Sequence, residues 1–295
     1  MKVLNMGSLN LDYVYTVDHI LKGGETLASK KMEVFCGGKG LNQSIAMAKA
    51  GVPVFHAGLI GEEGEPLLAV CQENGVDTGY IQKIEGKSGH TIIQVDKEAQ
   101  NCILLYGGSN RSFTKEYIDR VLEDFGEGDL LILQNEINLL DYVVDRAYDK
   151  NMVIILNPSP MDEALEAVDM GKISIFLMNE IEGAQIAGTE NPEDVLAVMK
   201  EKFPQARVVL TLGRDGCIYQ DSEKLCRQSA YEVKAVDTTA AGDTFTGYFI
   251  AGLLKGMEIE KILDMCARAS AIAVSRKGAA ASIPMMEEVI RASQK

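Results

Sequence analysis

A carboxylate that follows a run of small residues could perform acid–base chemistry on a phosphate group. The run Ala240-Ala241-Gly242-Asp243 precedes a helical pattern of apolar residues that stops before Gly256. Free N–H groups and the positive dipole end meet at the first turn of a helix, so it attracts anions, and small side chains let a phosphate come close. Asp243 could then accept the proton of a hydroxyl group that attacks the phosphate. The alternative is an aspartate that only caps the helix.

A glycine-rich run near the N-terminus offers groups that bind hydroxyls. Residues 37–43 read GGKGLNQ and lead into a helix of mostly small apolar residues. Glycines permit a ligand to approach the backbone, while Lys39 supplies a cation and Asn42 an amide. A tight turn followed by an amphipathic helix would explain the same residues without a ligand. The phosphate-binding pattern G-x-x-x-x-G-K-[ST] occurs nowhere in the sequence, so the run is not a loop of that type.

Polar residues also follow several predicted strands. Asn10 and Asp12 come after the first apolar run, Glu136 after another, and residues 179–182 (NEIE) and 211–216 (TLGRDG) after two more. Ligands of α/β proteins gather at the carboxyl ends of parallel strands, and Asp12 could accept two hydroxyls of a vicinal diol. The structural alternatives are an Asx turn at Asn10 and an acidic first helix turn that the dipole favours at 179–182.

The elements that would position these residues alternate between strand and helix from about residue 112. This alternation predicts an α/β fold, a doubly wound, mostly parallel sheet flanked by helices. The segments 11–36 and 91–106 do not follow it and predict a separate small β-sheet, and residues 1–295 are expected to form a single domain. Before residue 112, strands are predicted at 3–7 and 54–60 and helices at 37–51 and 67–74. After it, the predicted strands are 130–133, 153–156, 173–177 and 208–212, and the predicted helices are 139–150, 180–188, 192–202, 258–275 and 285–292.

Composition excludes several classes of function. The net charge of −14 disfavours a nucleic-acid partner. No apolar run approaches the length of a membrane span. The 6 cysteines are scattered without a C-x-x-C pair, and the 3 histidines lie far apart, so a zinc site is not expected. Reduced thiols in a cytoplasmic protein are the expectation.

The motifs together resemble those of the ribokinase-like carbohydrate kinases. Residues 235–245 are similar to the C-terminal signature of that family, with Ala240 in place of the first glycine of Gly-Ala-Gly-Asp, and residues 37–43 are similar to its N-terminal signature. Residues 107–110 resemble the motif that closes the lid hairpin, and residues 273–284 resemble the C-terminal loop of the family. The resemblance extends from residue 1 to about residue 290.

The resemblance implies transfer of the γ-phosphoryl group of ATP to the 5-hydroxyl of D-ribose, under a lid formed by the small sheet. Asp243 would be the catalytic base, and the amides of Ala240, Ala241, Gly242 and Asp243 would stabilise charge on the phosphoryl group, with Mg²⁺ bridging the phosphates. The sugar would be held by Asn10, Asp12, Gly38, Lys39, Asn42, Glu136 and Asp243.

The resemblance also implies sites for the nucleotide and for a monovalent cation. ATP would be bound by Asn179, Glu182, Thr211, Gly213, Gly216 and Gly242, with Glu182 organising Mg²⁺ through water. K⁺ would be wrapped by Asp237, Thr239, Ala273, Arg276, Gly278 and Ser282, mainly through carbonyl oxygens. Ala267 stands where many relatives carry a polar or ring side chain near adenine, so packing against the nucleotide can differ there.

Other acceptors stay open from the sequence: fructose, a ketodeoxy sugar acid, a nucleoside or a phosphosugar. A phosphosugar would need extra cations at the sugar pocket, where the motifs offer only Lys39 and, just after the lid hairpin, Arg111, which disfavours it, whereas Tyr13, Tyr15 and Tyr106 keep a nucleoside possible. A dinucleotide-binding oxidoreductase is disfavoured because no G-x-G-x-x-G follows the first strand. An inactive sugar sensor would be expected to lack the carboxylate of the first motif. Lids of two subunits pack together in the family, so a homodimer is expected.

Overall fold

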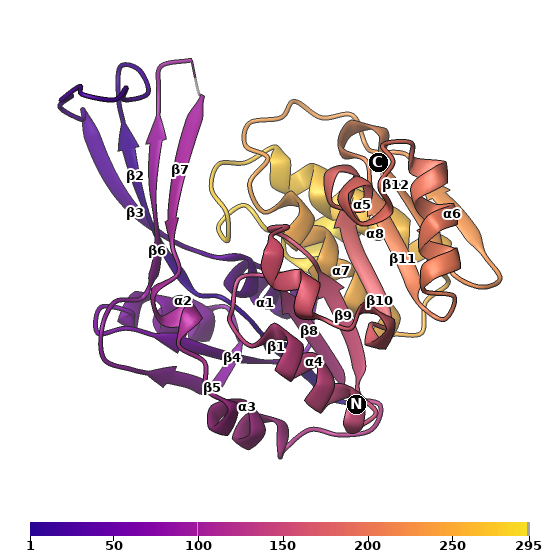
Figure 1. The fold of residues 1–295 in the computed structure, drawn as a ribbon. Coiled ribbons are helices and arrows are strands. Elements are labelled where there is room, and N and C mark those ends of the chain that lie inside the picture. Colours follow the sequence, from indigo (N-terminus) through magenta and orange to yellow (C-terminus); the bar gives the residue numbers. More distant parts are fainter. Residues whose placement is uncertain (99, 294–295) are drawn as a thin grey trace.

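Over the described residues, the large sheet has nine strands, seven of which pair in parallel. The structure, a computed structural model, describes residues 1–98 and 100–293. The strands from β11 to β5 pair in parallel, whereas β12 and β13 pair antiparallel at one edge (Figure 1). Their order across the sheet is β13 (Leu225–Gln228), β12 (Cys217–Gln220), β11 (Arg207–Thr211), β10 (Ile175–Asn179), β9 (Val153–Asn157), β8 (Leu130–Gln134), β1 (Val3–Met6), β4 (Val54–Ile60) and β5 (Asp77–Lys83).

The sequence of the central strands explains why helices cover both faces. Every residue of β1 and β8 is buried, and consecutive side chains enter opposite layers: Leu130 and Ile132 pack into one core, Leu131 and Leu133 into the other. One core includes residues of α1 (Lys39–Lys49), α2 (Glu65–Glu73), α7 (Ala241–Leu254), α8 (Ile259–Val274) and α9 (Met286–Ala292). The other includes residues of α3 (Lys115–Leu122), α4 (Leu140–Asp149), α5 (Glu180–Ala187) and α6 (Pro192–Lys202).

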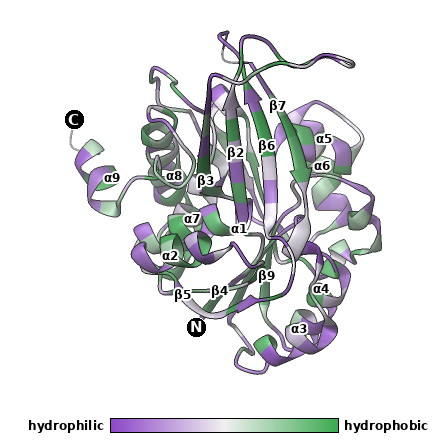
Figure 2. Cartoon of the chain, turned by 90° about the vertical axis from the view of Figure 1, so that its left-hand side faces the viewer, coloured by the Kyte–Doolittle hydropathy of each residue, from purple (hydrophilic) through white to green (hydrophobic). Residues whose placement is uncertain are grey.

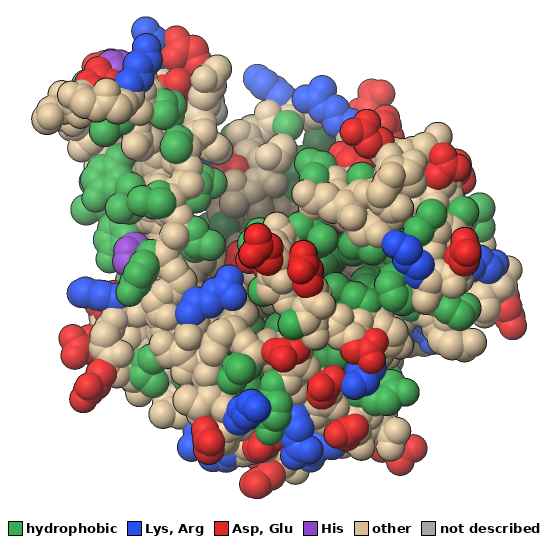
Figure 3. All heavy atoms as spheres, viewed as in Figure 1, with side chains coloured by type: hydrophobic (Ala, Val, Ile, Leu, Met, Phe, Trp, Pro, Cys, Tyr) green, Lys and Arg blue, Asp and Glu red, His purple; other side chains and the backbone are tan. Residues whose placement is uncertain are grey.

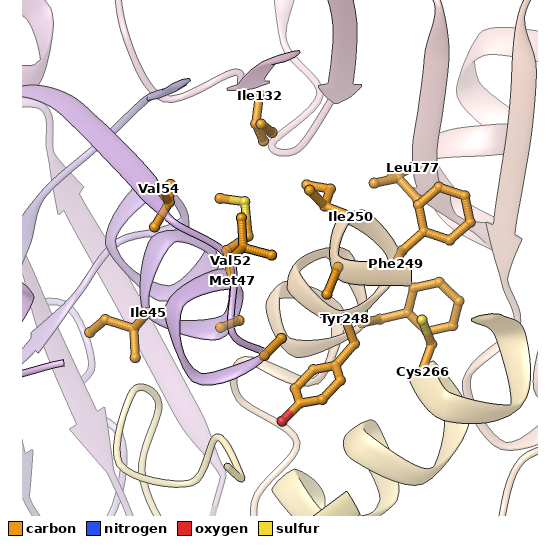
Figure 4. Packing of buried hydrophobic residues seen from close by; sticks show 14 of the residues in the cluster. Ile45, Met47, Val52, Val54, Ile132, Leu177, Tyr248, Phe249, Ile250 and Cys266 are labelled. Atoms are coloured by element: carbon orange, nitrogen blue, oxygen red, sulfur yellow. The ribbon is translucent and has the colours of Figure 1, made fainter. Parts of the chain in front are cut away.

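Helices α1 and α7 cross at small residues. A Cβ atom added to Gly247 would lie 2.4 Å from the Cβ atom of Ala46, so the two helices touch almost backbone to backbone. Around the crossing, Met47 of α1 and Ile250 of α7 pack in the buried layer beneath the sheet (Figure 4). This close approach places the first turns of both helices together at the carboxyl edge of the sheet.

The second sheet has four strands and stands out from the body (Figures 1 and 2). Its order is β3 (Lys31–Gly37), β2 (Asn10–Thr16), β6 (Gly89–Val95) and β7 (Asn101–Tyr106). The register places Phe35, Thr91 and Leu105 on the same face as Asp12. The exposed apolar side chains of this sheet are Met32, Val34, Phe35, Ile92, Ile103, Leu104, Leu105 and Tyr106.

The predicted fold class is confirmed, including the small sheet built from the two segments outside the βαβ alternation. Four elements were not predicted: β5, α3 and the antiparallel pair β12 and β13. The chain passes from β1 to β4 on one side and returns later to β8 on the other, so the strand order switches at β1. The carboxyl ends of strands at such a switch point are a preferred place for ligands. Across residues 1–98 and 100–293, no helix is both long enough and apolar enough to span a bilayer.

Candidate active site

Two cavities open along the carboxyl edge of the large sheet. Figure 3 shows the surface hollowed between the small sheet and the body. The first cavity, of about 250 Å³, lies at the base of the small sheet and is lined by Asn10, Leu105, Gly107, Asn110, Arg111 and Glu136. The second, of about 210 Å³, lies at the first turn of α7. The predicted site residues that line the second cavity are Lys39, Asn179, Glu182, Thr211, Ala240, Ala241, Gly242 and Asp243.

The first turn of α7 presents backbone amides to the second cavity. Ala240, the residue that caps α7, has a φ of 60°, a left-handed conformation that costs an alanine about 1–2 kcal/mol. Its side chain makes no capping hydrogen bond, and the turn is closed by the amide of Ala241 donating to the carbonyl of Thr238 at 3.3 Å. The following amides, including those of Gly242 and Asp243, are the helix-end donors that suit an anion.

Asp243 is buried, and its carboxylate is held by side chains of another helix. Oδ1 accepts a hydrogen bond from Nε2 of Gln43 at 3.0 Å, and Oδ2 accepts one from Nδ2 of Asn42 at 3.1 Å. Neither bond caps α7, so the structure does not support an aspartate that only caps its own helix. The Oδ1 atom of Asn42 is buried without a partner among the described residues, which leaves an acceptor for a ligand hydroxyl.

Lys39 and Glu136 are oppositely charged side chains at the two cavities: Glu136 lines the first cavity, and Lys39 lines the second. Burial alone would lower the pKa of Lys39, but nearby carboxylates, that of Asp243 foremost, outweigh it and raise the pKa above its usual value. Burial raises the pKa of Glu136, although the hydroxyl of Ser8 and the charge of Lys39 oppose the shift. Lys39 therefore remains a cation beside the anion-binding turn.

The glycines at the start of α1 are required by the backbone conformation and by close packing. Gly38 has a φ of 92°, which a residue with a side chain rarely adopts. A Cβ atom on Gly40 would lie 2.4 Å from the backbone nitrogen of Ser8, so only glycine lets α1 approach the end of β1. This approach brings the amide of Lys39 to Oε2 of Glu136 at 3.0 Å. Ser8, which also donates to that carboxylate, was missed by sequence reasoning because no motif marks it.

Asp12 lies at the base of the small sheet and lines neither of the two cavities. Its Oδ1 atom accepts a hydrogen bond from the hydroxyl of Thr91 at 2.5 Å, and burial raises its pKa. Its neighbour Asn10 does line the first cavity and accepts a hydrogen bond from Nδ2 of Asn110 at 2.7 Å. Asn110 was noticed only as part of a lid motif, and the structure shows it joining the small sheet to the body.

The predicted nucleotide residues have clear structural roles. Asn179 and Glu182 form a capping box at the start of α5: Oδ1 of Asn179 accepts from the amide of Glu182 at 2.9 Å, and Oε2 of Glu182 accepts from the amide of Asn179 at 3.0 Å. Thr211 donates to the carbonyl of Met178 at 3.4 Å. Gly213 and Gly216 flank the next turn but do not line the second cavity.

The segments predicted to wrap a monovalent cation lie together. The carboxylate of Asp237 accepts from the amide of Thr239 at 2.9 Å and from the amide of Gly278 at 3.0 Å. Burial opposes the effect of these bonds, yet the pKa of Asp237 lies below its usual value. In the same loop, Ala273 accepts from the amide of Arg276 at 3.1 Å. Ser282 is buried and donates to the carbonyl of Ala279 at 2.8 Å.

The side chains at these sites can be compared with the ligands that Mg²⁺ and K⁺, the two metal ions implied by the resemblance, prefer. Among the described residues, no group of three or more His, Cys, Asp or Glu side chains could hold a metal ion. This finding fits Mg²⁺ that is held mainly by phosphate oxygens and water, with Glu182 and Asp243 nearby in the same cavity. The loop with Asp237 offers carbonyl oxygens, which are ligands that K⁺ accepts.

Comparisons with known proteins agree with this arrangement. The model of the pfkB family carbohydrate kinases matches residues 1–286. The chain is 33% identical over 301 residues to a ribokinase of Staphylococcus aureus, covering 98% of each, and 31% identical over 299 residues to a ribokinase of Haemophilus influenzae, covering 97% of this chain and 96% of the relative. The crystal structure of a ribokinase from Thermotoga maritima superposes with a TM-score of 0.90 at 30% identity, covering 100% of each chain. The chain belongs to the pfkB family of carbohydrate kinases.

Proposed function

We propose that this protein is a ribokinase, which transfers the γ-phosphoryl group of ATP to the 5-hydroxyl of D-ribose. Several full-length relatives carry that name, and an Arabidopsis thaliana ribokinase solved with ribose and ATP superposes with a TM-score of 0.87 at 27% identity, covering 98% of this chain and 97% of the relative. The observation that carries the proposal is the position of Asp243. Its buried carboxylate lines the cavity that also contains the free amides of α7.

The proposed reaction is an in-line displacement. The 5-oxygen attacks the γ-phosphorus while its proton passes to Asp243, the bond to the bridging oxygen breaks, and ADP leaves. The amides of Gly242 and Asp243, with the Lys39 ammonium, stabilise the developing negative charge. Mg²⁺ bound to the phosphates supplies further neutralisation of charge. Asn42 and Glu136 offer acceptors for sugar hydroxyls, and Asp12 belongs to β2, a strand of the proposed lid.

The proposal also includes a K⁺ site and two roles for the small sheet. K⁺ held by Asp237, Ser282 and the carbonyls of Thr239, Ala273 and Gly278 would fix the turn before α7. The small sheet would act as a lid and as the contact of a homodimer, because it exposes apolar side chains on both faces: Phe35, Ile103 and Leu105 beside Asp12, and Met32, Val34, Ile92, Leu104 and Tyr106 on the opposite face. In a sedimentation experiment, a charge on the face that forms the contact should lower the dimer fraction: Ile103→Asp tests the face of Asp12, and Leu104→Asp tests the opposite face.

The acceptor is tested with a panel of sugars at fixed ATP and Mg²⁺. D-ribose should give the highest kcat/KM, ahead of D-fructose, 2-keto-3-deoxygluconate and adenosine. 2-Deoxy-D-ribose belongs in the panel because a deoxyribokinase of Salmonella typhi is 28% identical over 300 residues, covering 98% of this chain and 97% of the relative. A clear preference for another acceptor would overturn the specific reaction and leave the family unchanged. The six free cysteines are typical of a reducing compartment, and we place the enzyme in the cytoplasm.

A further inference from the structure

Gln43 is a buried polar side chain that contacts the proposed base but lines neither of the two cavities. It lies on α1 with 0% of its surface exposed and does not line the second cavity. Its Nε2 atom donates to Oδ1 of Asp243 at 3.0 Å and to Oδ1 of Asn157 at 3.3 Å, and its Oε1 atom accepts from Nε2 of Gln134 at 2.7 Å. Gln43 therefore makes three side-chain hydrogen bonds, and two of their partners, Asp243 and Asn157, line the second cavity.

The direction of the Gln43 amide is fixed by a chain of amides that starts at the backbone. Nδ2 of Asn5 donates to the carbonyl of Gly40 at 2.7 Å, and a carbonyl can only accept. Oδ1 of Asn5 must therefore face Gln134, whose Nε2 donates to it at 2.9 Å and also donates to Gln43. Gln43 is left with its oxygen toward Gln134 and its NH₂ group toward Asp243. Since Asn5, Gln43 and Gln134 are all fully buried, water cannot substitute for any of these partners.

We propose that Gln43 is a positioning residue that holds the carboxylate of Asp243 in a single orientation for proton transfer. This inference rests on the proposed function, because it assumes that Asp243 acts as the base. Oδ1 accepts from Gln43 and Oδ2 accepts from Asn42, so each oxygen is held by its own amide donor. A carboxylate fixed by two amide donors needs no rotation when the acceptor hydroxyl arrives, which lowers the cost of reaching the transition state.

The test is a pair of substitutions at Gln43. Gln43→Glu keeps the size but puts a carboxylate oxygen where the NH₂ group donates, and Gln43→Met keeps the length without a donor. Loss of a hydrogen bond to a charged group should lower kcat roughly 10- to 100-fold, with the KM values for both substrates changed only a few-fold. The charged groups around Asp243, which are Lys39, Glu136 and Glu182, are the same in both variants.

Ser44→Ala is the matched control. Ser44 lies on the same helix, is equally buried, and accepts from Nδ2 of Asn5 at 2.8 Å, but it does not contact Asp243. This variant should lose stability while it keeps kcat. If both Gln43 variants fold and keep kcat within a factor of about three, the positioning role is wrong.

A spectroscopic readout separates this inference from the proposed function. The infrared carboxylate band that disappears in Asp243→Asn should change its frequency in the Gln43 variants, whatever the acceptor, because Oδ1 has lost its hydrogen-bond donor. An unmoved band overturns the positioning role even if wild-type kinase activity is high. A moved band together with an inactive wild-type enzyme, across the whole acceptor panel, overturns the proposed function and leaves the Gln43 contact to Asp243 established.

Discussion

Replacing Asp243 with asparagine removes the proposed base without changing its size. The structure predicts a second effect as well. Both carboxylate oxygens accept from amide donors, Gln43 at 3.0 Å and Asn42 at 3.1 Å. In Asp243→Asn one of these oxygens becomes an NH₂ group, so one pair of buried donors must face each other. The variant therefore loses catalysis and also loses one satisfied hydrogen bond.

The two effects have different sizes. Loss of a general base lowers kcat by about 10²–10⁴, which corresponds to roughly 3–5 kcal/mol in the barrier. An unsatisfied buried donor costs about 1–3 kcal/mol of stability, and each kcal/mol lowers Tm by roughly 2–4 °C in chains slightly smaller than this one. The affinity for ATP should change little, because the amides of α7 remain in place.

The assay couples ADP formation to NADH oxidation, with Tm and ATP affinity measured on the same samples. Asp141→Asn is the matched control: Asp141 is also a carboxylate in the first turn of a helix, α4, but it is exposed. Its kcat should stay within about twofold of the wild type. If a folded Asp243→Asn protein kept more than about a third of the wild-type kcat, Asp243 would not be the base.

Three further predictions concern the acceptor, the cation and pH. Asp12→Ala should raise the KM of the sugar sharply and leave the KM of ATP within a few-fold, because sugar hydroxyls without a partner cost about 1–3 kcal/mol. Equal losses for both substrates would place Asp12 outside the acceptor site. K⁺ should raise activity severalfold over a buffer with Na⁺ alone, and Asp237→Ala should abolish that response; identical rates after dialysis with and without K⁺ would leave Asp237 a structural role only. Burial lowers the pKa of His56 to about 4, below the unfolded value of 6.5, so only the unfolded state binds its proton as the pH falls from 6.5 toward 4, and stability is lost in that window. The loss should reach about 2 kcal/mol between pH 7.5 and 5 in denaturant unfolding and should be absent in His56→Gln; an equal slope in both proteins would contradict the burial effect.

The layers of the fold could be predicted because the central strands are short, uniformly apolar runs. The antiparallel strands β12 and β13 were missed because each has only four residues, three of the eight are polar, and the apolar run is short. The strand predicted at 173–177 begins at Ile175, since Ile173 and Ser174 belong to the preceding turn. Boundaries of this kind depend on pairing with neighbours, which periodicity does not contain.

The sequence points to candidate site residues where they belong to motifs, and it misses residues that only tertiary contacts bring to them. The motifs gave Asp243 and Asn42, but the direct bond between them depends on the crossing of Ala46 and Gly247, which no local pattern reveals. Ser8 was missed for the same reason: it meets Glu136 only because α1 lies against the end of β1. Residue roles in the nucleotide and cation sites remain predictions.

The contact between Gln43 and Asp243 joins residues 200 positions apart in the chain. Strand β1, at the centre of the sheet, and helix α1 leave the ribosome long before α7 exists, so the N-terminal half must keep its buried amides without their last partner during synthesis. Contacts of such large sequence separation form slowly, because a long loop must close before they are gained. Catalytic competence is consequently one of the last properties that the folding chain acquires. Recovery of activity after dilution from denaturant should lag behind recovery of helical signal, and a shortened chain without α7 would retain strands but no working site.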